Sequence, residues 1–67
     1  MLIFHGFAEE VRRSRKRLGL TQEQAAEELS ISVRWFQYIE EGHRMPSTTL
    51  ALQMIALLEM DFPQRTT

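Results

Sequence analysis

The chain has 67 residues, which is enough for one domain, and a chain this short buries only about 60% of the surface that it exposes when unfolded. Hydrophobic residues make up 43% and charged residues 25%, a globular balance that argues against a disordered chain. The absence of cysteine excludes disulfides and thiolate metal sites, and His5 and His43 alone make a poor metal site. No apolar run is long enough to span a membrane or resembles a signal peptide, so we expect a cytoplasmic protein.

Apolar residues at helical spacing predict a first helix over residues 7–18. Val11 and Leu18 fall with Phe7 on one face of a 3.6-residue period. Gly19 then supplies a C-terminal stop, because glycine tolerates the left-handed conformation in which many helices end. We expect residues 1–6 to form an N-terminal extension.

A second helix begins after Thr21. Thr21 and Gln24 have the spacing of a capping box, in which a hydroxyl and an amide cap the first turn reciprocally. Small side chains on its inward stripe let another helix approach closely. The stripe consists of Ala25, Ala26 and Leu29.

A third helix follows after only three residues, 30–32. Ser32 is placed to cap it, Phe36 and Ile39 face inward, and Gly42 ends it. The order is therefore helix, tight turn, helix, which is the helix-turn-helix motif.

A fourth core helix starts after Ser47, which is its expected N-cap. Pro63 prevents much continuation, so the helical domain is expected over residues 7–60 and a C-terminal tail over 61–67. Apolar residues at i, i+3, i+4 and i+7 form its inward stripe: Ala51, Met54, Ile55 and Leu58.

A set of spaced positions carries a family pattern through these helices: Arg15, Leu18, Gly19 to Gln22, Ala26, Leu29, Ile31, Ser32, Ile39, Glu40, Gly42, Pro46 and Ser47. In register, they resemble the Cro/C1-type helix-turn-helix family, also called the Xre family, of phage repressors and bacterial regulators. The resemblance covers roughly residues 11–60 and implies a compact all-α, lambda-repressor-like domain. We expect four helices rather than a possible five, because only residues 61–67 follow Met60. The sequence departs from the pattern where Ala25 replaces a larger aliphatic residue and where Ser30 and Glu59 replace glycines.

The resemblance implies that the third helix, about residues 32–41, enters the major groove of double-stranded DNA. The chain would then be a transcriptional regulator, in the first instance a repressor, encoded by a bacterium or a phage. Arg34 has the fork that binds guanine O6 and N7, and Val33 can touch a thymine methyl. The positions that the resemblance assigns to base reading are Ser32, Val33, Arg34 and Tyr38.

Phosphate contacts are expected around the start of the second helix, where the helix dipole favours anions, and around the loop after the third. The residues assigned to the DNA backbone are Gln22, Gln37, Arg44 and Ser47. Trp35 lies between the inward and outward faces, so its indole either packs at the edge of the core or lies along a sugar-phosphate strand. The family pattern also implies that Arg15 and Glu40 form a salt bridge between the first and third helices, largely out of water.

The charge of the chain argues against DNA binding, because the net charge is −1 and Glu41 on the outward face repels phosphate. Cations crowd residues 12–17 and carboxylates crowd residues 23–28, which gives either opposite electrostatic faces or two solvated helix faces.

A single copy should bind weakly, so we consider a homodimer through the fourth helix. Apolar residues off its stripe and just beyond it form the candidate dimer patch: Leu50, Leu57, Met60 and Phe62. These leucines could instead pack under Leu2, Ile3 and Phe4.

Two other functions compete. The outward face of the third helix could dock another protein through Val33, Trp35 and Tyr38, since interface hot spots also use aromatic residues. An antitoxin-type regulator is a variant of the DNA hypothesis. An enzyme is not expected, and neither is a cofactor, because no histidine stands with a nucleophile, no glycine-rich phosphate loop exists, and so small a domain leaves no room for a deep pocket.

Overall fold

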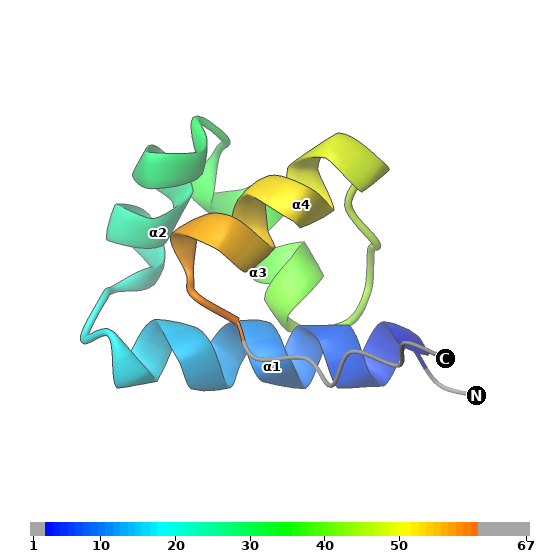
Figure 1. The fold of residues 1–67 in the computed structure, drawn as a ribbon. Helices are drawn as coiled ribbons and strands as arrows, with labels where there is room; N and C mark the ends of the chain where they lie inside the picture. Colours follow the sequence, from blue (N-terminus) through cyan, green and yellow to red (C-terminus); the bar gives the residue numbers. More distant parts are fainter. Residues whose placement is uncertain (1–2, 61–67) are drawn as a thin grey trace.

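The computed structural model describes residues 3–60, with side chains from residue 6 onward. Its four helices are α1 (Ile3–Arg17), α2 (Gln22–Leu29), α3 (Val33–Glu40) and α4 (Thr48–Leu57). Figure 1 shows α1 as the longest element, with α2, α3 and α4 all packed on one side of it. No strand is present within the described range, so the predicted all-α, four-helix fold is confirmed.

Helix α1 begins at Ile3, four residues earlier than the predicted start at Phe7. The prediction began at the first residue of the apolar stripe, whereas the backbone is already helical one turn before it and continues through Gly6. Glycine adds no periodic signal, and this one is exposed with open space around it. The domain boundaries drawn before residue 7 and after residue 60 stay predictions, and the tail lies outside the described residues.

Three predicted N-caps are confirmed. Thr21 Oγ1 accepts from the backbone N–H of Gln24 over 3.0 Å, and Gln24 Oε1 accepts from the backbone N–H of Thr21 over 2.8 Å, which completes the capping box of α2. The hydroxyls of Ser32 and Ser47 each accept from the backbone N–H three residues later, over 3.1 and 3.2 Å. Each cap satisfies an N–H that has no partner within the helix, so the beginnings of α2, α3 and α4 are defined locally.

All four helices end in the same way. The residue that closes each helix is left-handed, with φ of 73° at Gly19, 60° at Ser30, 81° at Gly42 and 52° at Glu59. The next backbone N–H then donates to the carbonyl five residues earlier, over 2.9 to 3.0 Å in each case, which is the Schellman pattern. The two non-glycine residues among these four, Ser30 and Glu59, are those that replace glycine in the family pattern.

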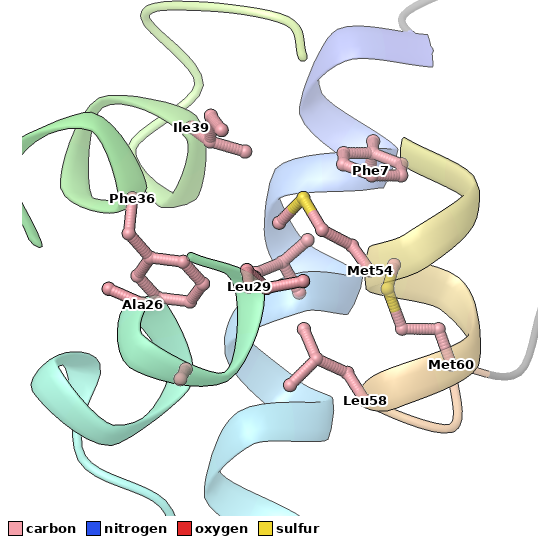
Figure 2. Packing of buried hydrophobic residues seen from close by; sticks show 10 residues of the cluster. Phe7, Ala26, Leu29, Phe36, Ile39, Met54, Leu58 and Met60 are labelled. Atoms are coloured by element: carbon pink, nitrogen blue, oxygen red, sulfur yellow. The ribbon is translucent and has the colours of Figure 1, made fainter. Parts of the chain in front are cut away.

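The core lies between α1 and the other three helices, and Figure 2 shows side chains from all four helices and Met60 converging there. The inward residues predicted for α2 and α3 are all buried. Of the stripe predicted for the fourth helix, Met54 and Leu58, the C-cap of α4, are buried, whereas Ala51 and Ile55 are half-buried against the cluster. The buried hydrophobic cluster consists of Phe7, Val11, Ala25, Ala26, Leu29, Phe36, Ile39, Met54, Leu58 and Met60.

Met60 corrects the sequence interpretation, which placed it in a surface patch. Its side chain is 8% exposed and belongs to the core. The left-handed turn at Glu59 reverses the chain after α4, and Figure 2 shows that Met60 points back toward the cluster. Arg17 fastens this turn to α1, because its Nη2 donates to the carbonyl oxygens of Glu59 and Leu58 over 2.6 and 3.3 Å.

Candidate nucleic-acid interface

Helix α3 has a buried side and an exposed side. Phe36 and Ile39 are 0% and 1% exposed, so they anchor the helix in the core. Ser32 and Arg34 are exposed, and Tyr38 is 37% exposed. Of the four residues assigned to base reading, these three lie on the free surface. The fourth, Val33, is half-buried and packs against the core, which leaves it less accessible than its place on the outward face indicated.

A hydrogen-bonded network of four side chains holds α3 from behind. Arg15 Nε donates to Glu40 Oε2 over 2.6 Å, and Arg15 Nη2 lies 3.4 Å from Glu40 Oε1. Gln22 Nε2 donates to the same Glu40 Oε1 over 2.6 Å. Gln37 Nε2 donates in turn to Gln22 Oε1 over 3.1 Å. The network therefore links α1, the first residue of α2 and two positions of α3.

Two residues assigned to the DNA backbone are thus engaged within the protein. Gln22 and Gln37 are half-buried, and each donates one amide N–H to a neighbouring side chain, Gln22 to Glu40 and Gln37 to Gln22. A glutamine amide has two N–H donors, so one remains on each residue. The sequence pattern showed that these side chains are polar and near α3, but it gave no indication that they bond to each other.

The loop between α3 and α4 is fastened to the end of α3. The carbonyl oxygen of Tyr38 accepts from the backbone N–H groups of His43 and Arg44, over 2.9 and 3.3 Å. The Arg44 and Ser47 side chains are exposed, and the Ser47 hydroxyl, although it accepts the capping bond of α4, can still donate. Both remaining backbone-contact candidates therefore lie on the surface beyond the far end of α3.

Three aromatic rings lie in a row along α3 and this loop. The rings of Trp35 and Tyr38 are 6.5 Å apart between centroids at 85°, and those of Tyr38 and His43 are 6.5 Å apart at 82°, both edge-to-face. Trp35 is half-buried and packs against the hydrophobic cluster, so of the two alternatives for its indole the structure has the core-edge position. Edge-to-face contacts of this kind hold the Tyr38 ring in one orientation.

A family model described as a helix-turn-helix domain matches residues 7–66, nearly the whole chain. The chain belongs to the helix-turn-helix domain family. This agrees with the resemblance to Cro/C1-type domains and with the order of helix, three-residue turn and helix from α2 to α3. Helix-turn-helix domains are DNA-binding modules, and α3 is the second helix of the motif here. No curated protein and no solved structure matches the chain.

The charges of this helix-turn-helix domain are separated in space. Among the described side chains of α1, four exposed cations stand against one exposed carboxylate, Glu9. The exposed charged residues of α2 are all carboxylates. Next to α3, the exposed Glu41 lies 3.4 Å from His43 Nε2. The exposed cations of α1 are Arg12, Arg13, Lys16 and Arg17, and the exposed carboxylates of α2 are Glu23, Glu27 and Glu28.

The outer face of α4 is uncharged and carries exposed leucines, but these differ from the predicted patch. Leu50 is half-buried against the core, whereas Leu57 is 45% exposed. Leu52, which the sequence analysis did not single out, is the most exposed large hydrophobic residue of the described chain at 61%. It stands two residues before the buried Met54, about 200° away around the helix, and this spacing was available as a signal. Phe62, the last member of the predicted patch, lies outside the described residues.

None of the helices between residues 3 and 60 has the length and hydropathy to cross a bilayer. In the same part of the chain, no group of three or more histidines and carboxylates is arranged to hold a metal ion.

Proposed function

We propose that this domain binds double-stranded DNA sequence-specifically with α3 in the major groove and acts as a transcriptional regulator that represses by occupying a promoter. The observation that carries the proposal is the way in which α3 is held. Glu40 and Gln37 tie its inner side to α1 and α2, while Arg34 and Tyr38 face solvent. A helix that is bonded to the protein on its inner side and exposed on its outer side suits insertion into the major groove, which is wide enough for one helix.

Base discrimination is assigned first to Arg34. Its side chain is exposed and no described carboxylate pairs with it, so its guanidinium is free to bind guanine O6 and N7 as a bidentate pair. Ser32 and Tyr38 supply hydroxyls on the same surface, and the exposed part of Val33 is available to a thymine methyl. We therefore expect Arg34 to set the strongest base preference.

The phosphates on the two sides of the groove are assigned to opposite ends of this surface. At one side stands Gln22, the first residue of α2, whose backbone N–H has no acceptor within its own helix. At the other side stand Arg44 and Ser47 in the loop before α4. Gln37 lies between them with one amide N–H left to donate.

We also propose that the domain acts as a homodimer through the outer face of α4, formed by Thr49, Leu52, Gln53, Ala56 and Leu57. All five side chains are exposed, and the sequence has no charged residue from 45 to 58, so two copies would meet without repulsion between like charges. The net charge of −1 limits what one copy gains from phosphates, whereas two copies reading half-sites about 34 Å apart would double those contacts.

The test is a titration of fluorescently labelled mixed-sequence duplex DNA with the full chain, read by anisotropy at two salt concentrations. Binding should weaken steeply with salt, because phosphate contacts release counterions. Arg34→Ala and Arg44→Ala should weaken it, whereas Arg13→Ala should not, because Arg13 is an exposed arginine that pairs with Glu10 within α1. No binding by the wild type at low salt would contradict the proposal.

A selected binding site then separates the two arginines. Arg34→Ala should cost about 1–3 kcal/mol and relax the preference at one base pair, while Arg44→Ala should weaken all sequences alike. If both variants weaken all sequences alike, Arg34 is a phosphate contact and its assignment to base reading is wrong.

The second candidate is a protein-docking surface. The row formed by Trp35, Tyr38 and His43 presents aromatic edges beside Arg34, a composition typical of interface hot spots. The low net charge of the chain favours this candidate. The same titration decides, because docking to a protein gives no DNA binding at low salt, and Tyr38→Ala should then weaken the protein complex.

A further inference from the structure

The basic segment of α1 is divided by the structure into cations with different partners. Arg15 pairs with Glu40, and Arg13 Nη1 lies 3.2 Å from Glu10 Oε1. Arg17 donates to the carbonyl oxygens at the end of α4. Arg12 and Lys16 are exposed, and no carboxylate among residues 6–60 pairs with either. These two therefore have charges that nothing in the described chain neutralises by contact.

Hydrogen bonds from α1 to its neighbours establish which edge each cation occupies. Arg12 Nη2 donates to the backbone carbonyl of Glu40 over 3.3 Å, so Arg12 lies on the edge next to α3. Arg17 lies on the edge next to α4, about 140° away at about 100° per residue. Lys16 follows Arg12 by four residues and lies one turn along the same edge, whereas Arg13 shares the other edge with Arg17.

The edge that carries Arg12 and Lys16 lies next to the residues that hold α3 and the start of α2. Glu40, whose carbonyl contacts Arg12, uses its carboxylate to hold Gln22 at the start of α2. Lys16 is one turn nearer to the loop that leads into α2, and Arg15 Nη1 bonds to Leu20 in that loop over 2.9 Å. A DNA strand that passes the start of α2 would therefore meet these two cations next.

We propose that Arg12 and Lys16 form a phosphate-binding edge for the DNA backbone that flanks the major-groove site. This rests on the proposed DNA-binding function and names a contact surface outside the helix-turn-helix motif itself. The ligand class is the phosphodiester backbone of duplex DNA, recognised by charge and without base preference. The edge supplies cations that α2 and α3 lack, since Arg34 is the one cation on those two helices.

The effect is measured as a salt slope. Each phosphate neutralised by a cation contributes about 0.9 to the slope of log K against log salt on duplex DNA. Lys16→Ala should lower the slope by about that amount, so that the affinity lost between about 50 and 200 mM salt shrinks roughly threefold. The probe is the labelled mixed-sequence duplex with the full chain, since the contact does not depend on sequence.

Arg13→Ala is the matched control, because Arg13 is an exposed cation three residues from Lys16 on the other edge of α1. It should leave the slope at the wild-type value. Arg12→Ala also removes the bond to the Glu40 carbonyl, so Arg12→Lys is measured beside it and should keep the slope. Circular dichroism of each variant should show the helix content of the wild type, which checks that the variant is folded.

The outcomes separate this inference from the proposed function. If Arg44→Ala weakens binding while Lys16→Ala leaves the slope unchanged, the phosphate-binding edge is wrong and the DNA-binding proposal stands. Equal slope changes in Lys16→Ala and Arg13→Ala would also overturn it, because the effect would then follow net charge rather than position. If the wild type binds no duplex at low salt, the proposed function fails and the edge with it.

Discussion

Arg15 and Glu40 form an ion pair that joins α1 to α3, with Arg15 Nε 2.6 Å from Glu40 Oε2. Their side chains are 13% and 4% exposed, so both charges are largely withdrawn from water. The pair is also the centre of the network, because Gln22 bonds to the carboxylate and Arg15 bonds to the loop before α2. The position of α3 relative to α1 and α2 therefore depends on these two residues.

Arg15→Ala should be far more damaging than Arg13→Ala. Removing one partner of a buried pair leaves an uncompensated charge and costs about 3–5 kcal/mol, comparable to the whole stability of so small a domain. Arg13 is 69% exposed in its pair with Glu10, so its loss should cost at most about 1 kcal/mol. Urea unfolding followed by circular dichroism measures both. Similar midpoints for the two variants would show that the Arg15 pair contributes no more than a surface contact.

Ser30→Gly and Glu59→Gly should each stabilise the domain. Both residues have left-handed backbones, which are strained for residues with a Cβ, and relief of that strain exceeds the extra chain entropy of glycine. We expect about 0.5–1 kcal/mol from each, measured as a higher melting temperature.

Gly42→Ala is the converse control for these two changes. Its φ is 81°, and an added Cβ would meet only the Ala8 Cβ at an ordinary 3.7 Å, so any loss of stability reports backbone strain alone. We expect a loss of about 1–2 kcal/mol. A destabilising Ser30→Gly would show that the serine side chain contributes a contact that outweighs the strain.

Ser14→Ala should leave the stability unchanged or raise it by about 1 kcal/mol. Ser14 is 0% exposed on α1, and its Oγ is buried without a hydrogen-bond partner in the described chain. An unsatisfied buried hydroxyl costs about 1–3 kcal/mol, and alanine is also the better helix former. Denaturant titration gives the free energy of unfolding. A loss above about 1 kcal/mol would mean that the hydroxyl has a partner, such as an internal water.

The proposed dimer predicts that the full chain self-associates through α4. Sedimentation equilibrium of the wild type should show a monomer–dimer equilibrium, and replacing Leu52 and Leu57 together with glutamine should shift it to monomer without loss of helix content. Met45→Gln is the control, because Met45 is 40% exposed but precedes α4, and it should leave the equilibrium unchanged. A wild type that is monomeric at all usable concentrations contradicts the dimer.

Packing with distant elements decided several features that the sequence pattern could not resolve. Gln22 and Gln37 are polar and near α3, as expected, but the bonds of Gln22 to Gln37 and to Glu40 join residues 15 and 18 positions apart. In the sequence, Leu50 and Leu57 both lie off the inward stripe of α4 and cannot be told apart. In the structure, Leu50 packs against the core, whereas Leu57 is exposed. The sequence shows that Glu59 replaces a glycine of the family pattern. It does not show that the turn there buries Met60, because that burial depends on the packed core.

The sequence alone determined the class of fold, the beginnings of α2, α3 and α4, and the ends of α1, α2 and α3. These depend on contacts within five residues, such as the capping box at Thr21 and the left-handed turn at Gly42, so local spacing suffices to predict them. Only the tertiary structure decided which edge of α1 each cation occupies and that Gln22 bonds to both Glu40 and Gln37. Those contacts join residues 15 to 42 positions apart, and their geometry exists only after the helices have packed.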